Sequence, residues 1–265
     1  MLPRFVAITR IISENPSIKT FVLDDVIPNA TPGQFVMLWL PGIDEKPFAI
    51  VAREPLTVTV AAVGPFSRAL HALNVGDQVG WRGPFGHGFD TNLQGNVLLM
   101  GGGYGVAALY FAASELSKQT REITVAVGGR TAQDLIFEDR LRELGVRVEL
   151  ATEDGSRGTR GLVTDAAQDA FSRAEQIMAC GPEAMLVAIM RLALARNIPA
   201  QLSVERYVKC GFGICGQCTI SGKLVCMDGP VLTAEELSHL PEFGRLHRDA
   251  SGAAHFFQGH GARRT

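Results

Sequence analysis

Four of the five cysteines lie together near the end of the chain, at Cys210, Cys215, Cys218 and Cys226. Whatever else the sequence does, the segment between them has to fold as a compact loop that brings thiols close to one another. The chain has 265 residues and begins without the long apolar stretch of a signal peptide. In a large chain of this kind, a cysteine cluster more often binds metal than forms disulfides.

The spacing within the cluster indicates which metal centre it binds. Four residues separate the first two cysteines, two separate the second from the third, and seven separate the third from the fourth. The opening matches the plant-type [2Fe–2S] spacing, and the interleaved Gly211, Gly213 and Gly216 let the loop turn its amides toward sulfur. Structural zinc is the alternative, although zinc loops usually hold two cysteine pairs separated by a longer spacer. Cys180 stands apart and is not expected to be a ligand.

The sequence up to residue 95 is typical of β-structure. Short runs rich in Val, Ile, Phe and Thr are broken by Pro and Gly, a spacing that predicts a small barrel or sandwich. One short helix is expected, at Pro65–Leu73. The predicted strands are Phe5–Ile11, Ile18–Leu23, Gln34–Leu40, Phe48–Ala52, Leu56–Val63 and Gln78–Trp81.

From Asn96 onward the pattern changes to alternating strands and helices. The strands are short and wholly apolar, which favours a parallel sheet covered on both faces. Strands are expected at Val97–Met100, Ile123–Val127, Val146–Ala151, Gln176–Cys180 and Pro199–Ser203. Helices are expected at Val106–Gln119, Ala132–Leu144, Leu162–Phe171 and Glu183–Arg196.

A glycine-rich loop, Gly101–Gly105, joins the first of these strands to the helix after it. In a parallel α/β domain, this junction is where the phosphates of a dinucleotide meet amides at a helix N-terminus. The loop lacks the full G-x-G-x-x-G spacing, so a simple tight turn is the alternative. A second turn, Cys180–Pro182, opens another helix, and we expect it to lie near the first.

The composition argues against two classes of function. The formal net charge is −2, without the excess of basic residues that marks a nucleic-acid-binding protein. No apolar run reaches the roughly 18 residues of a membrane span. We therefore expect a cytoplasmic protein that binds neither nucleic acid nor membrane.

Several short motifs follow one another in a characteristic order. Lys46–Ile50 reads Lys-Pro-Phe-Ala-Ile, and Gly64–Leu70 reads Gly-Pro-Phe-Ser-Arg-Ala-Leu. The later ones are Gly83–Gly86, Gly101–Leu109, Gly128–Thr131, Thr152–Ser156, Cys180–Pro182 and Asp228–Val231. In this order the motifs resemble the ferredoxin–NADP reductase superfamily and, within it, the electron-transfer subunits of two-subunit (type B) dihydroorotate dehydrogenases. The γ subunits of sulfhydrogenases and the flavin subunit of anaerobic sulfite reductase are close relatives.

The resemblance covers nearly the whole chain and implies three units. These are an FAD-binding β-barrel at 1–95, an NAD-binding α/β domain at 96–204, and a [2Fe–2S] segment with the tail at 205–265. It implies flavin contacts at Lys46, Pro47, Phe48, Ala49, Ile50, Gly64, Phe66 and Ser67. It implies NAD contacts at Gly102, Gly103, Gly105, Val106, Arg130, Cys180, Gly181 and Pro182. The cluster ligands are then Cys210, Cys215, Cys218 and Cys226.

Two residues depart from the family's first flavin motif. Lys46 replaces the usual Arg, and a lysine neutralises a phosphate as a point charge without the planar fork. Ala49 replaces the usual Ser and removes one hydroxyl. These changes weaken single contacts without removing the site.

The resemblance also implies an activity. Electrons pass between a nicotinamide nucleotide and a catalytic flavoprotein subunit, through FAD and the cluster, in pyrimidine biosynthesis. Hydride transfer needs alignment of the two rings, so no general acid or base is assigned. NAD(H) is favoured over NADP(H), because no basic cluster for a 2′-phosphate stands out.

Three other functions stay open at this point. The same cofactors can serve a soluble hydrogenase or a sulfite reductase, and the seven-residue gap before Cys226 suits those relatives. A flavin reductase without a dedicated partner is the second alternative. A zinc-stapled binding scaffold without redox activity is the third.

Overall fold

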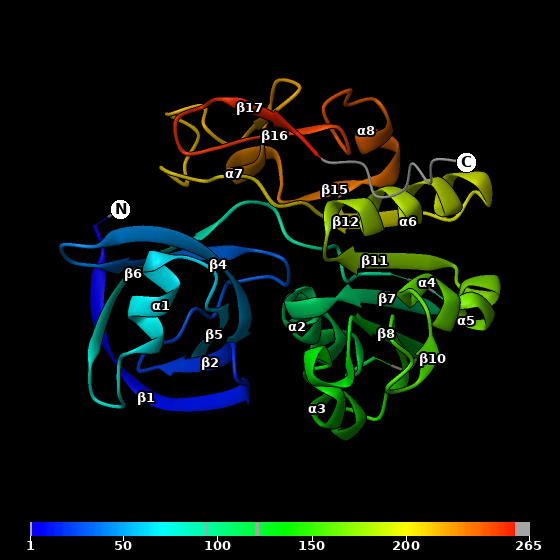
Figure 1. The fold of residues 1–265 in the computed structure, drawn as a ribbon, viewed down its shortest axis with the longest axis horizontal. Helices are drawn as coiled ribbons and strands as arrows, with labels where there is room; N and C mark the ends of the chain where they lie inside the picture. Colours follow the sequence, from blue (N-terminus) through cyan, green and yellow to red (C-terminus); the bar gives the residue numbers. More distant parts are fainter. Residues whose placement is uncertain (1, 94, 120–121, 258–265) are drawn as a thin grey trace.

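The computed structural model describes residues 2–93, 95–119 and 122–257. Figure 1 shows a barrel formed by the N-terminal part of the chain, a sheet flanked by helices, and a C-terminal segment that lies over both. No helix in the described ranges is long and apolar enough to span a membrane.

Six antiparallel strands close the barrel in the order β1-β2-β5-β4-β3-β6. They are β1 (Arg4–Asn15), β2 (Ile18–Leu23), β3 (Phe35–Leu40), β4 (Asp44–Arg53), β5 (Leu56–Ala61) and β6 (Gln78–Phe85). The closed ladder leaves no free sheet edge, and it confirms the predicted barrel. β4 begins earlier than predicted, because Asp44–Pro47 pair with β3 as far as Leu40.

Inward-facing side chains fill the barrel. Phe21, Leu38 and Trp81 are at most 1% exposed, as expected for large apolar residues on a closed pleated surface. Helix α1 (Pro65–His71) adds Phe66 and Leu70 to the same core. The alternate residues of β4 face outward, and this is the side on which the other two parts of the molecule lie.

A seven-stranded sheet follows, in the order β10-β9-β8-β7-β11-β12-β15. All neighbouring pairs are parallel except β12 and β15. The parallel strands are β7 (Val97–Gly102), β8 (Ile123–Gly129), β9 (Arg147–Thr152), β10 (Thr159–Arg160), β11 (Gln176–Cys180) and β12 (Ala200–Ser203). The predicted parallel sheet is therefore confirmed, with β10 as an additional edge strand.

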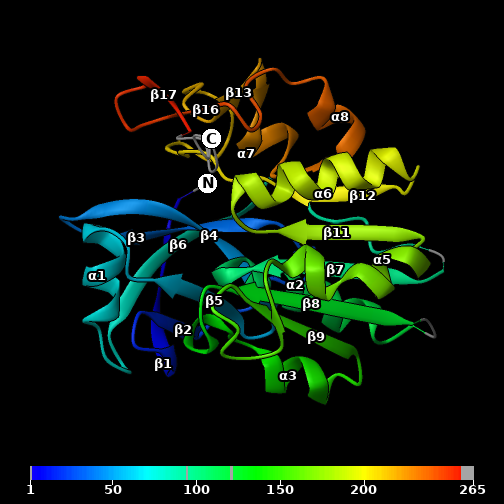
Figure 2. The same cartoon turned by 45° about the vertical axis from the view of Figure 1, so that its right-hand side comes forward.

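Helices cover both faces of this sheet, as Figure 2 shows. One face carries α2 (Val106–Leu116) and α3 (Glu138–Glu143), and the other carries α4 (Val163–Ala166), α5 (Gln168–Arg173) and α6 (Glu183–Ala195). Each face of the sheet has its own apolar core. Neighbouring residues of β7 point into different ones, since Leu99 packs with α2 and Leu98 packs with α6.

Two predicted helices are interrupted in the structure. The expected helix Ala132–Leu144 is reduced to a 3₁₀ turn, η2 (Ala132–Asp134), and to α3, because Phe137 before α3 has a left-handed backbone with φ 67°. The expected helix Leu162–Phe171 is divided into α4 and α5 at Ala167, whose ψ of 5° interrupts the helical geometry. Neither change alters the order of the sheet.

The strand order creates a crevice at one edge of the sheet. After β7 the chain builds β8, β9 and β10, and then returns to the other side of β7 as β11. The helices that follow β7 and β11 therefore leave toward opposite faces. In open α/β sheets, ligands bind outside the carboxyl ends of strands at such a switch point.

The C-terminal segment has little regular structure of its own. Its elements are β13 (Thr219–Ile220), β14 (Lys223–Leu224), α7 (Val225–Asp228), β15 (Val231–Thr233), α8 (Ala234–Ser238), β16 (Leu246–Arg248) and β17 (Ala254–Phe256). β15 pairs antiparallel with β12 and so joins the seven-stranded sheet, although it falls in the predicted unit 205–265. The three unit boundaries stay a prediction.

Candidate functional site

A cavity of about 250 Å³ lies where the barrel, the sheet and the C-terminal segment meet. The barrel contributes residues of β3, β4 and β5. The sheet contributes the turns after β7 and β11, and the C-terminal segment contributes the chain that follows β12. A ligand in this cavity contacts all three parts at once.

The predicted flavin contacts on β4 divide between the cavity and the barrel core. Pro47, Phe48 and Ala49 line the cavity and make its barrel wall apolar. Ile50 is 0% exposed and packs inside the barrel, so its side chain cannot contact a ligand in the cavity. An apolar wall of this kind fits a planar ring system such as that of a flavin.

The second predicted flavin motif lies at the N-terminus of α1. The Gly64 amide donates to Ser67 Oγ at 2.9 Å, and Ser67 Oγ donates to Gly64 O at 3.1 Å. Phe66 is 3% exposed and stacks on Phe48 with 5.9 Å between ring centroids. Because Val63 lines the cavity, the motif adjoins it, while the Ser67 hydroxyl serves a local helix cap.

Lys46 lies outside the lining of the cavity. Its ammonium group is 3.4 Å from the Tyr207 hydroxyl and 5.1 Å from the centre of the Tyr207 ring, and it pairs with Asp44. Lys46 thus joins the barrel to the chain that leads into Cys210. Its role in flavin binding stays a prediction.

The two predicted nucleotide turns touch each other. A Cβ atom at Gly105 would lie 2.5 Å from the Cys180 carbonyl oxygen, so only glycine allows this contact. Gly103 has φ +54°, and no atom lies within 4 Å of the position of its missing Cβ. Open space therefore lies in front of the loop before α2, where a phosphate can approach the backbone.

The other predicted nucleotide residues lie at these turns, with one exception. A Cβ at Gly102 would be 2.8 Å from Pro182 Cδ, and Pro182 is the N-cap of α6. Gly181 and Val106 complete the two turns, and Val106 is buried at the start of α2. Arg130 is exposed at the next strand and is outside the cavity lining. It forms no ion pair among the described residues.

Three cavity residues, at the end of β12 and in the glycine loop, were not predicted from the sequence. Tyr104, Ser203 and Glu205 line the cavity beside Cys180. The signal was present, because β12 was predicted as a parallel strand and the carboxyl ends of parallel strands meet at one edge. Ser203 and Glu205 follow from that rule, whereas the direction of the Tyr104 side chain does not.

The cavity is electrostatically unusual around Glu205. Glu205 is accessible through the cavity, but surrounding protein raises the pKa of its carboxyl, and the Tyr104 hydroxyl at 3.5 Å opposes that shift. The charge of Glu205, followed by burial, raises the pKa of Tyr104 to about 12. Burial, followed by the charge of Glu205, raises the pKa of Cys180 to about 12. Cys180 is therefore a neutral thiol at the sheet side of the cavity.

The four clustered cysteines form two hydrogen-bonded pairs. Cys210 and Cys215 are hydrogen-bonded to each other, and so are Cys218 and Cys226. In the second pair, the Cys226 amide donates to Cys218 Sγ at 3.4 Å. None of them forms a disulfide. In residues 2–93, 95–119 and 122–257, no three His, Cys, Asp or Glu side chains converge on a single point as ligands of one ion. Two pairs fit a [2Fe–2S] core, since each of its irons takes two thiolates.

Backbone amides support thiolates in the first pair. Burial opposes ionisation of Cys210, but hydrogen bonds from the amides of Cys215, Phe212 and Ile214 bring the pKa of its thiol down to about 6. Amides directed at ligand sulfurs stabilise the negative charge of an iron–sulfur core. The second pair is buried, with Cys218 and Cys226 each 1% exposed. The loop therefore fits the predicted cluster, although the ligand assignment itself stays a prediction.

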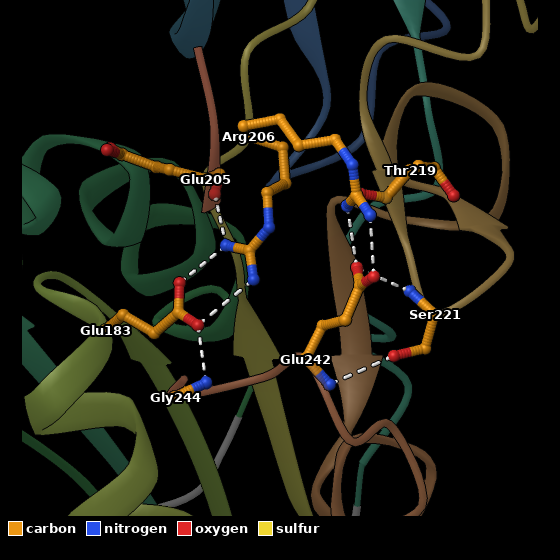
Figure 3. Close-up of polar contacts among 8 residues, drawn as sticks. Glu183, Glu205, Arg206, Thr219, Ser221, Glu242 and Gly244 are labelled. Carbon is orange, nitrogen blue, oxygen red and sulfur yellow. Dashed lines mark hydrogen bonds and ion pairs between the residues drawn. The ribbon is translucent and has the colours of Figure 1, made fainter. Parts of the chain in front are cut away.

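A buried ion pair links this loop to the sheet. Arg206, four residues before Cys210, donates to both carboxylate oxygens of Glu183, the first residue of α6. The side chains are 3% and 10% exposed. Figure 3 shows that Arg206 also donates to the Glu205 carbonyl, at 2.7 Å. The cysteine loop is thus fixed to the helix that begins at the cavity.

The barrel, the nucleotide-type sheet and the paired cysteines together define an oxidoreductase of the ferredoxin–NADP reductase type with an added iron–sulfur segment. Two family models match the chain, the oxidoreductase NAD-binding domain at residues 99–191 and the iron–sulfur cluster binding domain of dihydroorotate dehydrogenase B at residues 205–238. The chain belongs to the family of dihydroorotate dehydrogenase B electron transfer subunits.

Curated relatives carry this assignment. A protein of Methanocaldococcus jannaschii named as a probable electron transfer subunit of dihydroorotate dehydrogenase B (NAD(+)) is 44% identical over 254 residues, which cover 94% of this chain and 97% of that protein. A protein of the same name from Methanothermobacter thermautotrophicus is 40% identical, with 95% and 96% covered.

A solved structure agrees with this fold. A chain of an NADH-dependent reduced ferredoxin–NADP oxidoreductase, described in work on flavin-based electron bifurcation, matches with a TM-score of 0.80 and 31% identity. The match covers 87% of this chain and 88% of that chain. The ferredoxin reductase of carbazole 1,9a-dioxygenase matches with a TM-score of 0.63 and 21% identity, which shows the fold alone.

Proposed function

We propose that this chain is the electron-transfer subunit of an NAD-linked dihydroorotate dehydrogenase. It holds FAD at the barrel side of the cavity, NAD(H) at the turns after β7 and β11, and a [2Fe–2S] cluster in the cysteine loop. The observation that carries the proposal is the cavity itself, because its walls come from the flavin, nucleotide and cluster parts together. The relatives named for dihydroorotate dehydrogenase, at up to 44% identity, favour this partner over a hydrogenase or sulfite reductase.

The chain's own residues have three tasks in this reaction. Pro47, Phe48 and Ala49 hold a flat ring and exclude water from one side of it. The open backbone at Gly103 receives the nucleotide phosphates, and the neutral Cys180 thiol lies against the ring region. When bound, FAD supplies the exchange between paired electrons of a nicotinamide and single electrons of the cluster. Alignment, rather than acid–base chemistry, is then the main contribution of the protein.

An exposed apolar patch beside the cysteines suits a protein partner. Phe212, Ile214 and Met227 are 53%, 78% and 47% exposed, and they flank Cys210, Cys215 and Cys226. Large apolar side chains gathered on a surface mark interaction sites. We infer that the catalytic flavoprotein subunit docks on this patch. Electrons then cross a short distance between the cluster of this chain and the flavin of the catalytic subunit. The complex is then cytoplasmic, in keeping with five free cysteines.

A tagged chain isolated without oxygen from its native host tests the proposal. The expected product is a yellow-brown complex that contains FAD, two irons and two sulfides for each copy of this chain, and a dihydroorotate dehydrogenase catalytic chain. It should reduce NAD⁺ with dihydroorotate. If the same spectrum comes with a different catalytic chain, the partner is another enzyme and not dihydroorotate dehydrogenase. A colourless zinc protein would overturn the redox function.

A further inference from the structure

A second ion pair lies within the C-terminal tail, residues 239–257, and connects it to the cysteine loop, residues 210–226. Arg248 donates to both carboxylate oxygens of Glu242, at 2.8 and 2.7 Å. The Glu242 carboxylate also accepts from the Ser221 amide at 2.9 Å, and the Glu242 amide donates to Ser221 Oγ at 3.0 Å. The Arg248 hydrogen bonds, together with that of Ser221, bring the pKa of Glu242 to about 2 against the effect of burial. Ser221 lies between the third and fourth cysteines.

The contact extends to the other side of the loop. Arg248 donates to the Thr219 carbonyl at 3.4 Å. Gln217, which lies between Cys215 and Cys218, donates to the Asp249 and Ala250 carbonyls at 3.0 and 3.2 Å. The turn between β16 and β17 therefore holds the loop at a point next to two of the cysteines.

The same tail is fixed to the sheet. The Gly244 amide donates to Glu183 Oε1 at 2.6 Å, and this is the carboxylate that also receives Arg206. Figure 3 shows the two networks side by side, with Glu183 anchoring both the entry to the loop and the tail. The loop is thus held from the helix that begins at the cavity and from the tail that lies on it.

We infer that Glu242 and Arg248 form a clasp that positions the cysteine loop, and that this clasp sets how tightly the cluster is held and at what potential it works. The role is one of positioning, since neither side chain is placed as a ligand. The inference rests on the proposed function for its effect on the cluster, whereas its effect on the loop stands on the contacts alone.

The clasp acts by keeping the cysteine loop from opening locally. The loop has only two-residue strands, so few backbone ladder bonds hold it. A bidentate arginine–carboxylate pair is a strong polar contact, and both partners are mostly covered, with side chains 25% and 20% exposed. Without it, the open form of the loop becomes more populated, and thiolates and solvent exchange more freely around the core.

The experiment compares Arg248→Ala with Arg245→Ala in the full chain. Arg245 is exposed on the same tail and makes no ion pair among the described residues, so its replacement removes the same charge without the clasp. Two quantities are measured: amide hydrogen exchange of residues 210–226, and release of iron to a chelator together with the midpoint potential of the cluster.

For Arg248→Ala we expect about tenfold faster exchange in the loop, about tenfold faster iron release and a shifted potential. Arg245→Ala should match the wild type in all three. Arg248→Lys should recover part of the effect, because lysine keeps the charge but not the fork. Flavin content and the rate of flavin reduction by NADH should not change.

If Arg248→Ala exchanges its loop amides and releases iron at the same rates as the wild type, the clasp is overturned. If that variant does not fold, Glu242→Gln decides by the same measurements, since it keeps the shape of the side chain. A wild-type chain that lacks flavin or cluster would instead contradict the proposed function. Loop exchange would still judge the clasp in that case, because it requires no cofactor.

Discussion

The barrel and the cysteine loop are stabilised in opposite ways. The barrel closes six strands into one continuous hydrogen-bonded ladder around residues such as Phe21 and Leu38 that are 0% exposed. The cysteine loop has two strands of two residues each, and it depends on side-chain contacts from Arg206, Gln217 and Arg248. The loop is therefore stabilised by a few strong side-chain contacts, whereas the barrel is stabilised by many weaker ones.

This difference teaches which part needs its cofactor to be stable. The barrel encloses an apolar core of fully buried side chains, whose burial stabilises it without a cofactor contact. In the loop, binding of a metal centre contributes directly to the stability of the fold. Cofactor loss should thus loosen the loop and leave the barrel intact.

Replacing Cys226 by Ser should abolish the cluster and keep the flavin. Cys226 is 1% exposed and belongs to the buried pair, so no other thiol can take its place. Iron content and the visible spectrum measure the first effect, and flavin fluorescence after denaturation measures the second. Cys180→Ser is the control and should retain the iron. Loss of both cofactors in Cys226→Ser would contradict the independence of the barrel.

Replacing Arg206 by Ala should destabilise the loop by about 3–5 kcal/mol, because Glu183 is left buried without its only charged partner among the described residues. Hydrogen exchange should show the change in residues 205–230 and not in the barrel strands. Lys118→Ala, which breaks the exposed pair with Glu115, should cost less than about 1 kcal/mol. An equal effect of the two variants would show that the buried pair has no special weight.

Replacing Gly105 by Ala should separate nucleotide binding from flavin binding. The added Cβ meets the Cys180 carbonyl oxygen at 2.5 Å and Gly181 Cα at 2.9 Å, and neither backbone atom can move alone. A cost of about 1–3 kcal/mol should appear as a raised KM for NAD⁺. Gly64→Ala, whose Cβ would meet nothing within 4 Å, should leave the KM unchanged. A raised KM in the control would point to a general loss of structure.

Replacing Glu205 by Gln should remove a pH dependence of nucleotide choice. Burial raises the pKa of the Glu205 carboxyl, so the group stays protonated to higher pH than an exposed glutamate and becomes a carboxylate as the pH rises further. The carboxylate attracts the positive ring of NAD⁺ and not the neutral ring of NADH. Affinity for NAD⁺ relative to NADH should therefore rise with pH in the wild type, by about 1 kcal/mol, and stay flat in the variant. A flat wild-type profile would exclude this role.

Much of the fold followed from the sequence, because its signals are local. Strand alternation predicted the barrel, wholly apolar strands predicted the parallel sheet, and the cysteine spacing predicted a compact loop that brings its thiols together. The breaks at Phe137 and Ala167 were not predictable, since each depends on one backbone angle set by tertiary packing.

The site was predictable to a smaller extent. Motif positions indicated Pro47, Phe48 and Ala49, but they could not show that Ile50 and Phe66 face the barrel core. Side-chain direction depends on register, and the register is fixed only when the strands pair. The pairs Glu183–Arg206 and Glu242–Arg248 were also invisible, because charged residues in a sequence do not reveal which partners they meet.

The antiparallel strand β15 gives the cysteine loop a property of its own. Ser203 in β12 lies opposite Val231 in β15, and the Val204 amide donates to the Pro230 carbonyl at 2.9 Å. Residues 204–230 therefore leave the sheet and return to it at the same place, like the arm of a very long hairpin. Closing so long a loop costs little more than closing a short one, since the closure entropy grows only slowly with the number of residues. The sheet thus fixes both ends of the segment that carries the four cysteines, so residues between these two anchor points can open and close without moving the anchors.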